Sequence, residues 1–138
     1  MASLPLSTSR SSFAPAALAL IGRVGIAAIF VLSGISKLAA PAAMIAYIKS
    51  SGLPLPEVAL AIAIVIELGG SIALILGYRT RFVAAAIAAF SIVTAFVFHR
   101  ALGDQSQFIN FFKNVAIAVG LLNVIALGGG AWSLDARR

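Results

Sequence analysis

Residues 58–77 read VALAIAIVIELGGSIALILG, an apolar run in which Glu67 is the only charged side chain. Its length matches the roughly 20 residues that a helix needs to cross the hydrocarbon core of a bilayer. Runs of this length that carry a single charge are typical of membrane helices and rare in soluble proteins. The sequence therefore predicts a transmembrane helix over residues 58–77.

Further apolar runs of similar length flank this one on both sides. We expect each of them to be a transmembrane helix: residues 16–36, 82–98 and 108–127. The turn at residues 78–81 is too short to join anything but antiparallel neighbours. Pro41 and the stretch at residues 50–56 bracket a longer loop, within which we expect a short interfacial helix at residues 44–48.

The predicted fold class is therefore an all-α membrane protein, an antiparallel bundle of four transmembrane helices. One domain accounts for all of residues 1–138. The composition agrees, because 62% of the residues are hydrophobic and only 10% are charged, whereas soluble domains average about 25% charged residues. A soluble domain of this size could not bury so much apolar surface.

Several function classes are excluded by the composition. The net charge is +6, but the basic residues are scattered singly and form no stripe for binding nucleic acid. The chain has no cysteine, which excludes disulfides, thiol catalysis and Cys-ligated iron–sulfur clusters. His99 is the only histidine and cannot supply both axial ligands of a haem. The sequence predicts no metal site.

The ends of the spans carry an uneven distribution of basic residues, which predicts the topology. Residues 1–12 are polar and Ser-rich and are expected to form a short cytoplasmic tail. Cleavage of the first span as a signal peptide is the alternative, but an internal Arg23 and the length of the span argue against it. The side that holds both termini collects Arg10, Arg79, Arg81, Arg137 and Arg138, against Lys49 and Arg100 in the opposite loops. Both termini are therefore predicted to be cytoplasmic.

Two ionisable residues, Arg23 and Glu67, fall deep inside predicted spans. Counted at about 1.5 Å per residue, they lie about one helical turn apart in depth on antiparallel neighbours. We therefore expect a buried ion pair, with Ser91 or Asn123 as a supporting partner. Such a pair either fixes the register of the helices or takes part in proton transfer or substrate binding.

A second polar group is predicted near the opposite, outer surface. It comprises two sets with i, i+3, i+4 spacing and one histidine: Ser33, Ser36 and Lys37; Asn110, Lys113 and Asn114; and His99. In one interpretation the lysines reach the lipid headgroups and the amides cap the last helix. In the other the layer is a shallow basic pocket open to the bilayer, suited to a quinone head group, an anionic lipid or a small metabolite.

The sequence resembles the DoxX family of bacterial membrane proteins over residues 16–135, nearly the whole chain. The motifs that carry the resemblance are Gly22-Arg23, residues 30–38 (FVLSGISKL), residues 52–54 (GLP), residues 66–70 (IELGG), residues 77–81 (GYRTR), Phe98-His99, residues 112–117 (FKNVAI) and the closing glycines 128–130. Each motif is weak by itself, and their order and spacing make the resemblance specific.

The resemblance implies a four-helix fold in the bacterial inner membrane. It also implies an association with membrane oxidoreductases, since the family is named for a terminal quinol oxidase and related proteins occur in thiosulfate:quinone oxidoreductase. It assigns no catalytic residue, so whether the chain is an enzyme stays open. The expected function is a small subunit of a quinone-linked redox system. The alternatives are a non-catalytic scaffold in a larger complex and a small-molecule transporter. Expected partners are lipid, oxidoreductase subunits or further copies of the chain.

Overall fold

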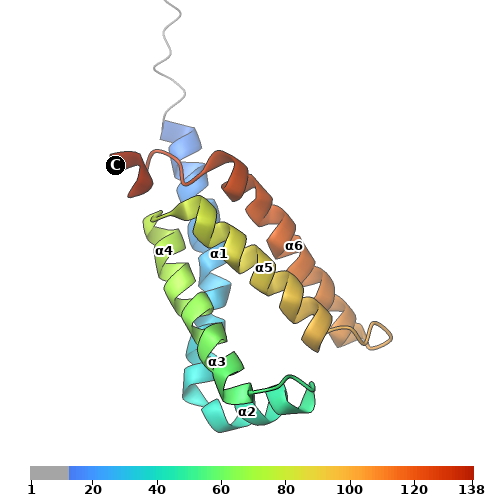
Figure 1. Cartoon of the computed structure of the whole chain (residues 1–138). Helices are drawn as coiled ribbons and strands as arrows, with labels where there is room; N and C mark the ends of the chain where they lie inside the picture. The colour runs from blue at the N-terminus through green and yellow to red at the C-terminus, as the bar shows by residue number, and fades with distance from the viewer. Residues whose placement is uncertain (1–12) are drawn as a thin grey trace, which may run out of the picture.

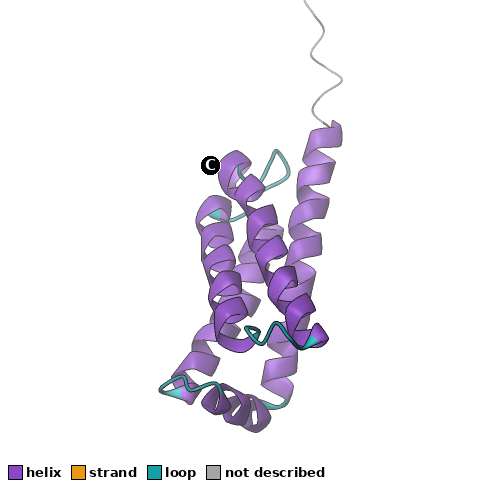
Figure 2. Ribbon diagram, turned by 90° about the vertical axis from the view of Figure 1, so that its right-hand side faces the viewer, coloured by secondary structure: helices purple, strands orange, loops and turns teal. Residues whose placement is uncertain are grey.

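The computed structural model describes residues 13–138, so the predicted cytoplasmic tail lies outside the described residues. Within this range the structure contains helices and loops and no strand (Figure 2). The helices are α1 (Phe13–Ala39), α2 (Pro41–Ser50), α3 (Pro56–Ile64), α4 (Gly70–Leu76), α5 (Thr80–Phe98) and α6 (Gln105–Leu127). A π-helical turn, Val65–Gly69, joins α3 to α4 without a break, and a 3₁₀ turn covers Asp135–Arg137.

Four helical segments are long and apolar enough to cross a membrane: α1, the continuous segment Pro56–Leu76, α5 and α6. This confirms the predicted four-helix transmembrane fold. Some helices extend beyond the apolar runs, because local signals set their ends. The helix α1 continues to Ala39 and stops just before Pro41, as expected next to a proline. The helix α6 begins at Gln105, where the Asp104 carboxylate accepts a hydrogen bond from Gln107 N at 3.0 Å.

The bundle consists of two helix pairs. The helix α1 packs along α3 and α4, and α5 packs along most of α6. The pairs meet at the end that holds the start of α1, the α4–α5 turn and the C-terminal segment, which we call the terminal end (Figure 1). They separate toward the opposite end, which α2 crosses and which we call the α2 end (Figure 1).

Small residues let the two pairs meet closely near the terminal end. Ala84 and Ala27 are fully buried, together with Leu74, Ile87 and Leu121. Gly70 leaves so little space that a Cβ atom there would lie 3.2 Å from Ile87 Cδ1. Close approach of small residues drives helix association in lipid, where no hydrophobic effect acts between helices. The core therefore lies toward the terminal end.

The helix α2 is longer than the short interfacial helix predicted at residues 44–48. It begins at Pro41, in the first helical turn, where the absent N–H costs no hydrogen bond. Tyr47 stacks on Phe98 at the end of α5, with ring centroids 5.3 Å apart. The helix α2 is thereby joined to both helix pairs across the wide end of the bundle.

The C-terminal segment folds back onto the α4–α5 turn. Gly77, at φ +70°, ends α4 in a Schellman motif in which Tyr78 N donates to Ala73 O and Gly77 N to Leu74 O. Leu134 N donates to Leu76 O and Asp135 N to Gly77 O, both at 2.9 Å. These hydrogen bonds make the C-terminal segment, residues 131–138, part of the packed fold.

Candidate functional site

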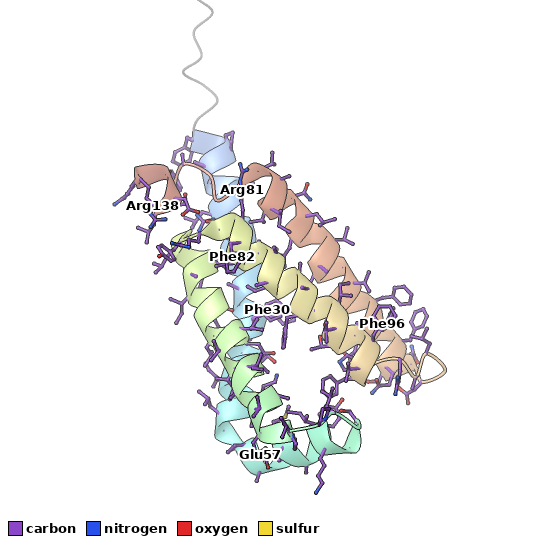
Figure 3. The ribbon with its side chains drawn as sticks, viewed as in Figure 1. Phe30, Glu57, Arg81, Phe82, Phe96 and Arg138 are labelled. Carbon is purple, nitrogen blue, oxygen red and sulfur yellow. The ribbon has the colours of Figure 1, made fainter. Side chains whose placement is uncertain are left out.

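A cavity of about 400 Å³ occupies the space between the two helix pairs at the α2 end. Its walls are mainly apolar and come from every helix of the bundle except α4. Phe30 projects into the space between α4 and α5, where it forms part of the wall (Figure 3). Ile62 and Val93 line the cavity and are each more than half exposed, so the rim faces the lipid side of the bundle.

The first polar group of the cavity is a hydrogen-bonded triad on α1 and the π-helical turn. Lys37 Nζ lies 3.0 Å from Glu67 Oε1 and 2.8 Å from Ser33 Oγ. Ser33 Oγ donates to the same carboxylate oxygen at 3.1 Å. Glu67 is only 3% exposed, and its Oε2 has no hydrogen-bond partner. The triad therefore holds a paired charge at membrane depth with one acceptor oxygen left over.

Two features of the backbone bring Glu67 to this position. Glu67 lies in the π-helical turn Val65–Gly69, and single π turns occur often at functional sites. Gly34 on α1 has no side chain, and a Cβ there would lie 2.6 Å from Leu68 Cγ. The missing Cβ lets the π turn approach α1 closely, which places the carboxylate beside Ser33 and Lys37.

The second polar group lies across the cavity on α5 and α6. Asn114 Nδ2 donates to Thr94 Oγ1 at 3.0 Å, and His99 Nδ1 lies 3.2 Å from Gln107 Oε1. Lys113 also lines the cavity, and its Nζ donates to Asn110 Oδ1 at 3.1 Å. This wall offers an amide, an imidazole and an ammonium group to an occupant.

The predicted ion pair between Arg23 and Glu67 is wrong. Glu67 pairs with Lys37 instead, and Arg23 Nη1 donates to Leu74 O and Ile75 O, both at 2.7 Å. The reason is the direction in which helical side chains lean, which is toward the N-terminus of their own helix. Arg23 therefore leans toward the terminal end, whereas Lys37 and Glu67, on antiparallel segments, lean toward each other.

Arg23 binds backbone carbonyl groups at the terminal end. The last carbonyls of a helix lack intrahelical partners and carry the negative end of the helix dipole. Arg23 is 1% exposed and donates to two of the last carbonyls of α4, one of which, Leu74 O, also accepts from Gly77 N; its Nη2 donates to Trp132 O. It thus ties α1, α4 and the C-terminal segment together, far along the bundle from the cavity.

Most of the polar layer predicted from sequence lines the cavity. Its lining members are Ser33, Lys37, His99, Lys113 and Asn114. Ser36 is exposed outside the cavity, and Asn110 contacts it only through Lys113. The sequence analysis did not predict that Glu67, Thr94 and Tyr47 line this cavity. Counting residues along the helix had placed Glu67 too deep, because it ignored the lean of the side chain.

The cavity can bind a molecule with an apolar body and polar atoms at one end. Its free donors come from ammonium, amide and imidazole groups, which suit carbonyl, hydroxyl or ionised oxygen atoms. Over residues 13–138, no cluster of three or more His, Cys, Asp or Glu side chains has the arrangement needed to hold a metal ion. The apolar walls and the polar donors of the cavity together suit an organic ligand.

Comparisons with known proteins agree with this architecture. The DoxX family model matches residues 18–100 of the chain. Inner membrane protein YphA of Escherichia coli (strain K12) is 36% identical over 125 residues, covering 87% of this chain and 89% of that protein. Inner membrane protein YqjF of the same organism is 32% identical over 116 residues, covering 84% and 88%. No solved structure matches the chain significantly. The chain is therefore a multi-pass inner-membrane protein that belongs to the DoxX family.

Proposed function

We propose that this protein is a small subunit or accessory of a membrane redox system and that its cavity binds the head group of a lipid-soluble quinone. The observation that carries the proposal is the cavity itself, which combines apolar walls, a rim open toward lipid and cationic donors. Ring carbonyls accept hydrogen bonds from ammonium and amide groups. An aromatic ring packs well against side chains such as Phe30 and Phe90, which line the cavity.

These residues support binding of the quinone, and we assign the electron transfer to a partner protein. The triad of Ser33, Lys37 and Glu67 is held in place by its own hydrogen bonds, which pre-organises the polar end of the cavity. A partner oxidoreductase in the same membrane would reduce or oxidise the bound quinone. The small chain would supply a site near that partner and restrict the ring to one orientation.

The direct test is quinone binding by the purified protein in a neutral detergent. A short-tailed benzoquinone is titrated, with empty micelles measured in parallel to subtract partitioning. Ala59 lines the cavity and Ala61 is exposed on α3 outside it. Ala59→Phe fills the cavity and should weaken binding by about tenfold or more, whereas Ala61→Phe should bind like the parent. Absence of saturable binding in the parent would reject the quinone site.

The alternative function is a scaffold that holds oxidoreductase subunits or further copies of the chain without binding a ligand. Purification in mild detergent, followed by mass spectrometry of lipids, cofactors and proteins, separates the two functions. A quinone that copurifies with the parent and is lost in Ala59→Phe supports the binding site. A stable partner that copurifies equally with both forms, with no quinone, supports the scaffold.

We also propose that the terminal end of the bundle faces the cytoplasm. Arg81 and Arg138 both lie at this end, and Glu57 lies at the α2 end (Figure 3). Excess of Lys and Arg on one side favours the cytoplasm for that side. The cavity, at the α2 end, would then lie nearer the outer surface of the inner membrane.

A further inference from the structure

The charges around the cavity do not cancel. Lys37 and Lys113 both line it, and Glu67 is the only acidic residue that does so. Glu67 is paired with Lys37 at 3.0 Å, which is the one salt bridge found across residues 13–138. After Lys37 and Glu67 neutralise each other, the lining of the cavity has one positive charge left, that of Lys113.

No acidic residue of the chain is available to neutralise Lys113. The sequence contains four acidic residues in all. Asp104 accepts the capping hydrogen bond from Gln107 N, and Asp135 lies at the terminal end. Glu57 is exposed at the start of α3 and does not line the cavity. The described contact of the Lys113 ammonium is the neutral amide of Asn110, at 3.1 Å.

Lys113 lies on α6, one of the four helices that are long and apolar enough to cross a membrane. It is eight residues beyond the start of that helix at Gln105, about 12 Å along the helix axis. An ammonium group at membrane depth is costly unless it meets a counter-charge or reaches the headgroups. Lys113 lines the cavity, so its flexible side chain can bring the ammonium group to a charge held there.

We infer that the preferred occupant of the cavity carries a negative charge on the oxygen atoms of its polar end, and that Lys113 binds this charge. The inference rests on the proposed quinone site and names the form of ligand that it selects: a ring with an ionised hydroxyl group rather than a neutral ring. Lys37 has the different task of neutralising Glu67. The two lysines of the cavity are therefore not equivalent.

Charge selection can be measured with two ligands that share one ring. A naphthoquinone with its hydroxyl group on the quinone ring is ionised at neutral pH, because the negative charge is shared with a ring carbonyl, and its methyl ether is neutral. Dissociation constants are measured in a neutral detergent, with empty micelles in parallel. Since a hydrogen bond between charged groups is stronger than a neutral one, the parent should bind the anion about tenfold tighter than the ether.

The variants isolate Lys113 from other sources of charge. Lys113→Gln keeps a hydrogen-bond donor and should bind both ligands equally, and Lys113→Arg should restore the preference. Lys49→Gln removes an exposed lysine of α2 that does not line the cavity, and should leave the preference unchanged. Because Lys113 is exposed and outside the core, these variants should fold, which melting curves will check.

The outcomes separate this inference from the proposed function. Equal binding of anion and ether by the parent, or a preference that survives Lys113→Gln, overturns charge selection and leaves the quinone site standing. Absence of binding by either ring overturns both. Laurate, which carries a carboxylate without a ring, is the third ligand. If laurate binds as tightly as the hydroxynaphthoquinone and depends on Lys113, charge selection stands and the quinone proposal fails.

Discussion

Side-chain direction decides which charges meet inside this bundle. The residues Arg23 and Glu67 appear well matched when depth is counted along the helix axes. In the structure Arg23 binds carbonyl oxygens at the end of α4, and Glu67 binds Lys37. A long side chain covers more than one helical turn, so its lean toward the helix N-terminus changes its partner. Depth alone is therefore a poor guide to pairing in antiparallel membrane helices.

The pairing of Lys37 with Glu67 can be tested by a double-mutant cycle. Removing one member of a buried pair strands the other charge, at a cost of about 3–5 kcal/mol. Lys37 is 16% exposed, so we expect values at the lower end of this range for Lys37→Ala and Glu67→Ala. The double variant should recover part of the loss, measured by reversible unfolding in mixed micelles.

Arg23 provides the matched control for that cycle. Arg23 and Glu67 share no hydrogen-bond partner, so the losses from Arg23→Ala and Glu67→Ala should add. Strict additivity for Lys37 with Glu67, or strong coupling of Arg23 with Glu67, would show that the observed pairing is incorrect.

At the scale of single elements, the start of α5 depends on a residue from the far end of the chain. The Asp135 carboxylate accepts hydrogen bonds from Arg79 N at 2.8 Å and from Thr80 N and Thr80 Oγ1 at 2.7 Å. The hydrogen bond from the Thr80 hydroxyl, followed by that from its backbone N–H, lowers the pKa of Asp135 below its ordinary value of 3.8. The carboxylate thus caps a helix whose own N-cap residue, Arg79, makes no side-chain cap.

This cap predicts a pH dependence of stability. Because the pKa is lower in the folded state, the stabilisation is complete above about 3.8 and is lost as the pH falls through the lower, folded-state pKa. At neutral pH, Asp135→Asn keeps an acceptor oxygen but removes the charge, so it should lower the free energy of unfolding by about 1 kcal/mol, the difference between a charged and a neutral hydrogen bond. In acid, the free energy of unfolding of the parent should approach that of the variant. A difference that stays constant from neutral pH down to about pH 2 would contradict the role of the ionised cap.

At the same scale, the sequence predicted the existence of the helices better than their irregularities. The apolar runs identified all four spans, because a membrane helix satisfies its own backbone and needs only a long apolar surface. The π turn at residues 65–69 has no comparable signal, since its extra residue is set by packing against α1 at Gly34. The role of Asp135 as a cap for α5 could not be predicted either, because Asp135 and Thr80 are 55 residues apart in the sequence.

For the whole molecule, the proposed topology is open to a direct measurement. Arg79 and Arg81 join Arg137 and Arg138 at the terminal end, which should therefore be cytoplasmic. Reporters fused after residue 80 and after residue 138 should both give cytoplasmic signals in cells, and a reporter in the loop near Gly103 should give a periplasmic one. Reversal of all three signals would show that the cavity lies near the cytoplasm instead.

The sequence by itself determined that this protein crosses the membrane four times and that its polar residues gather near one surface. Both are properties of composition and spacing along single helices. The tertiary structure alone decided that Lys37 neutralises Glu67, that Lys113 stays unpaired and that the two helix pairs separate around a cavity. Those outcomes depend on how each helix is rotated and how closely its neighbours approach. Packing at positions such as Gly34 and Gly70 sets the rotation of each helix and its distance from its neighbours. No local sequence pattern predicts either quantity.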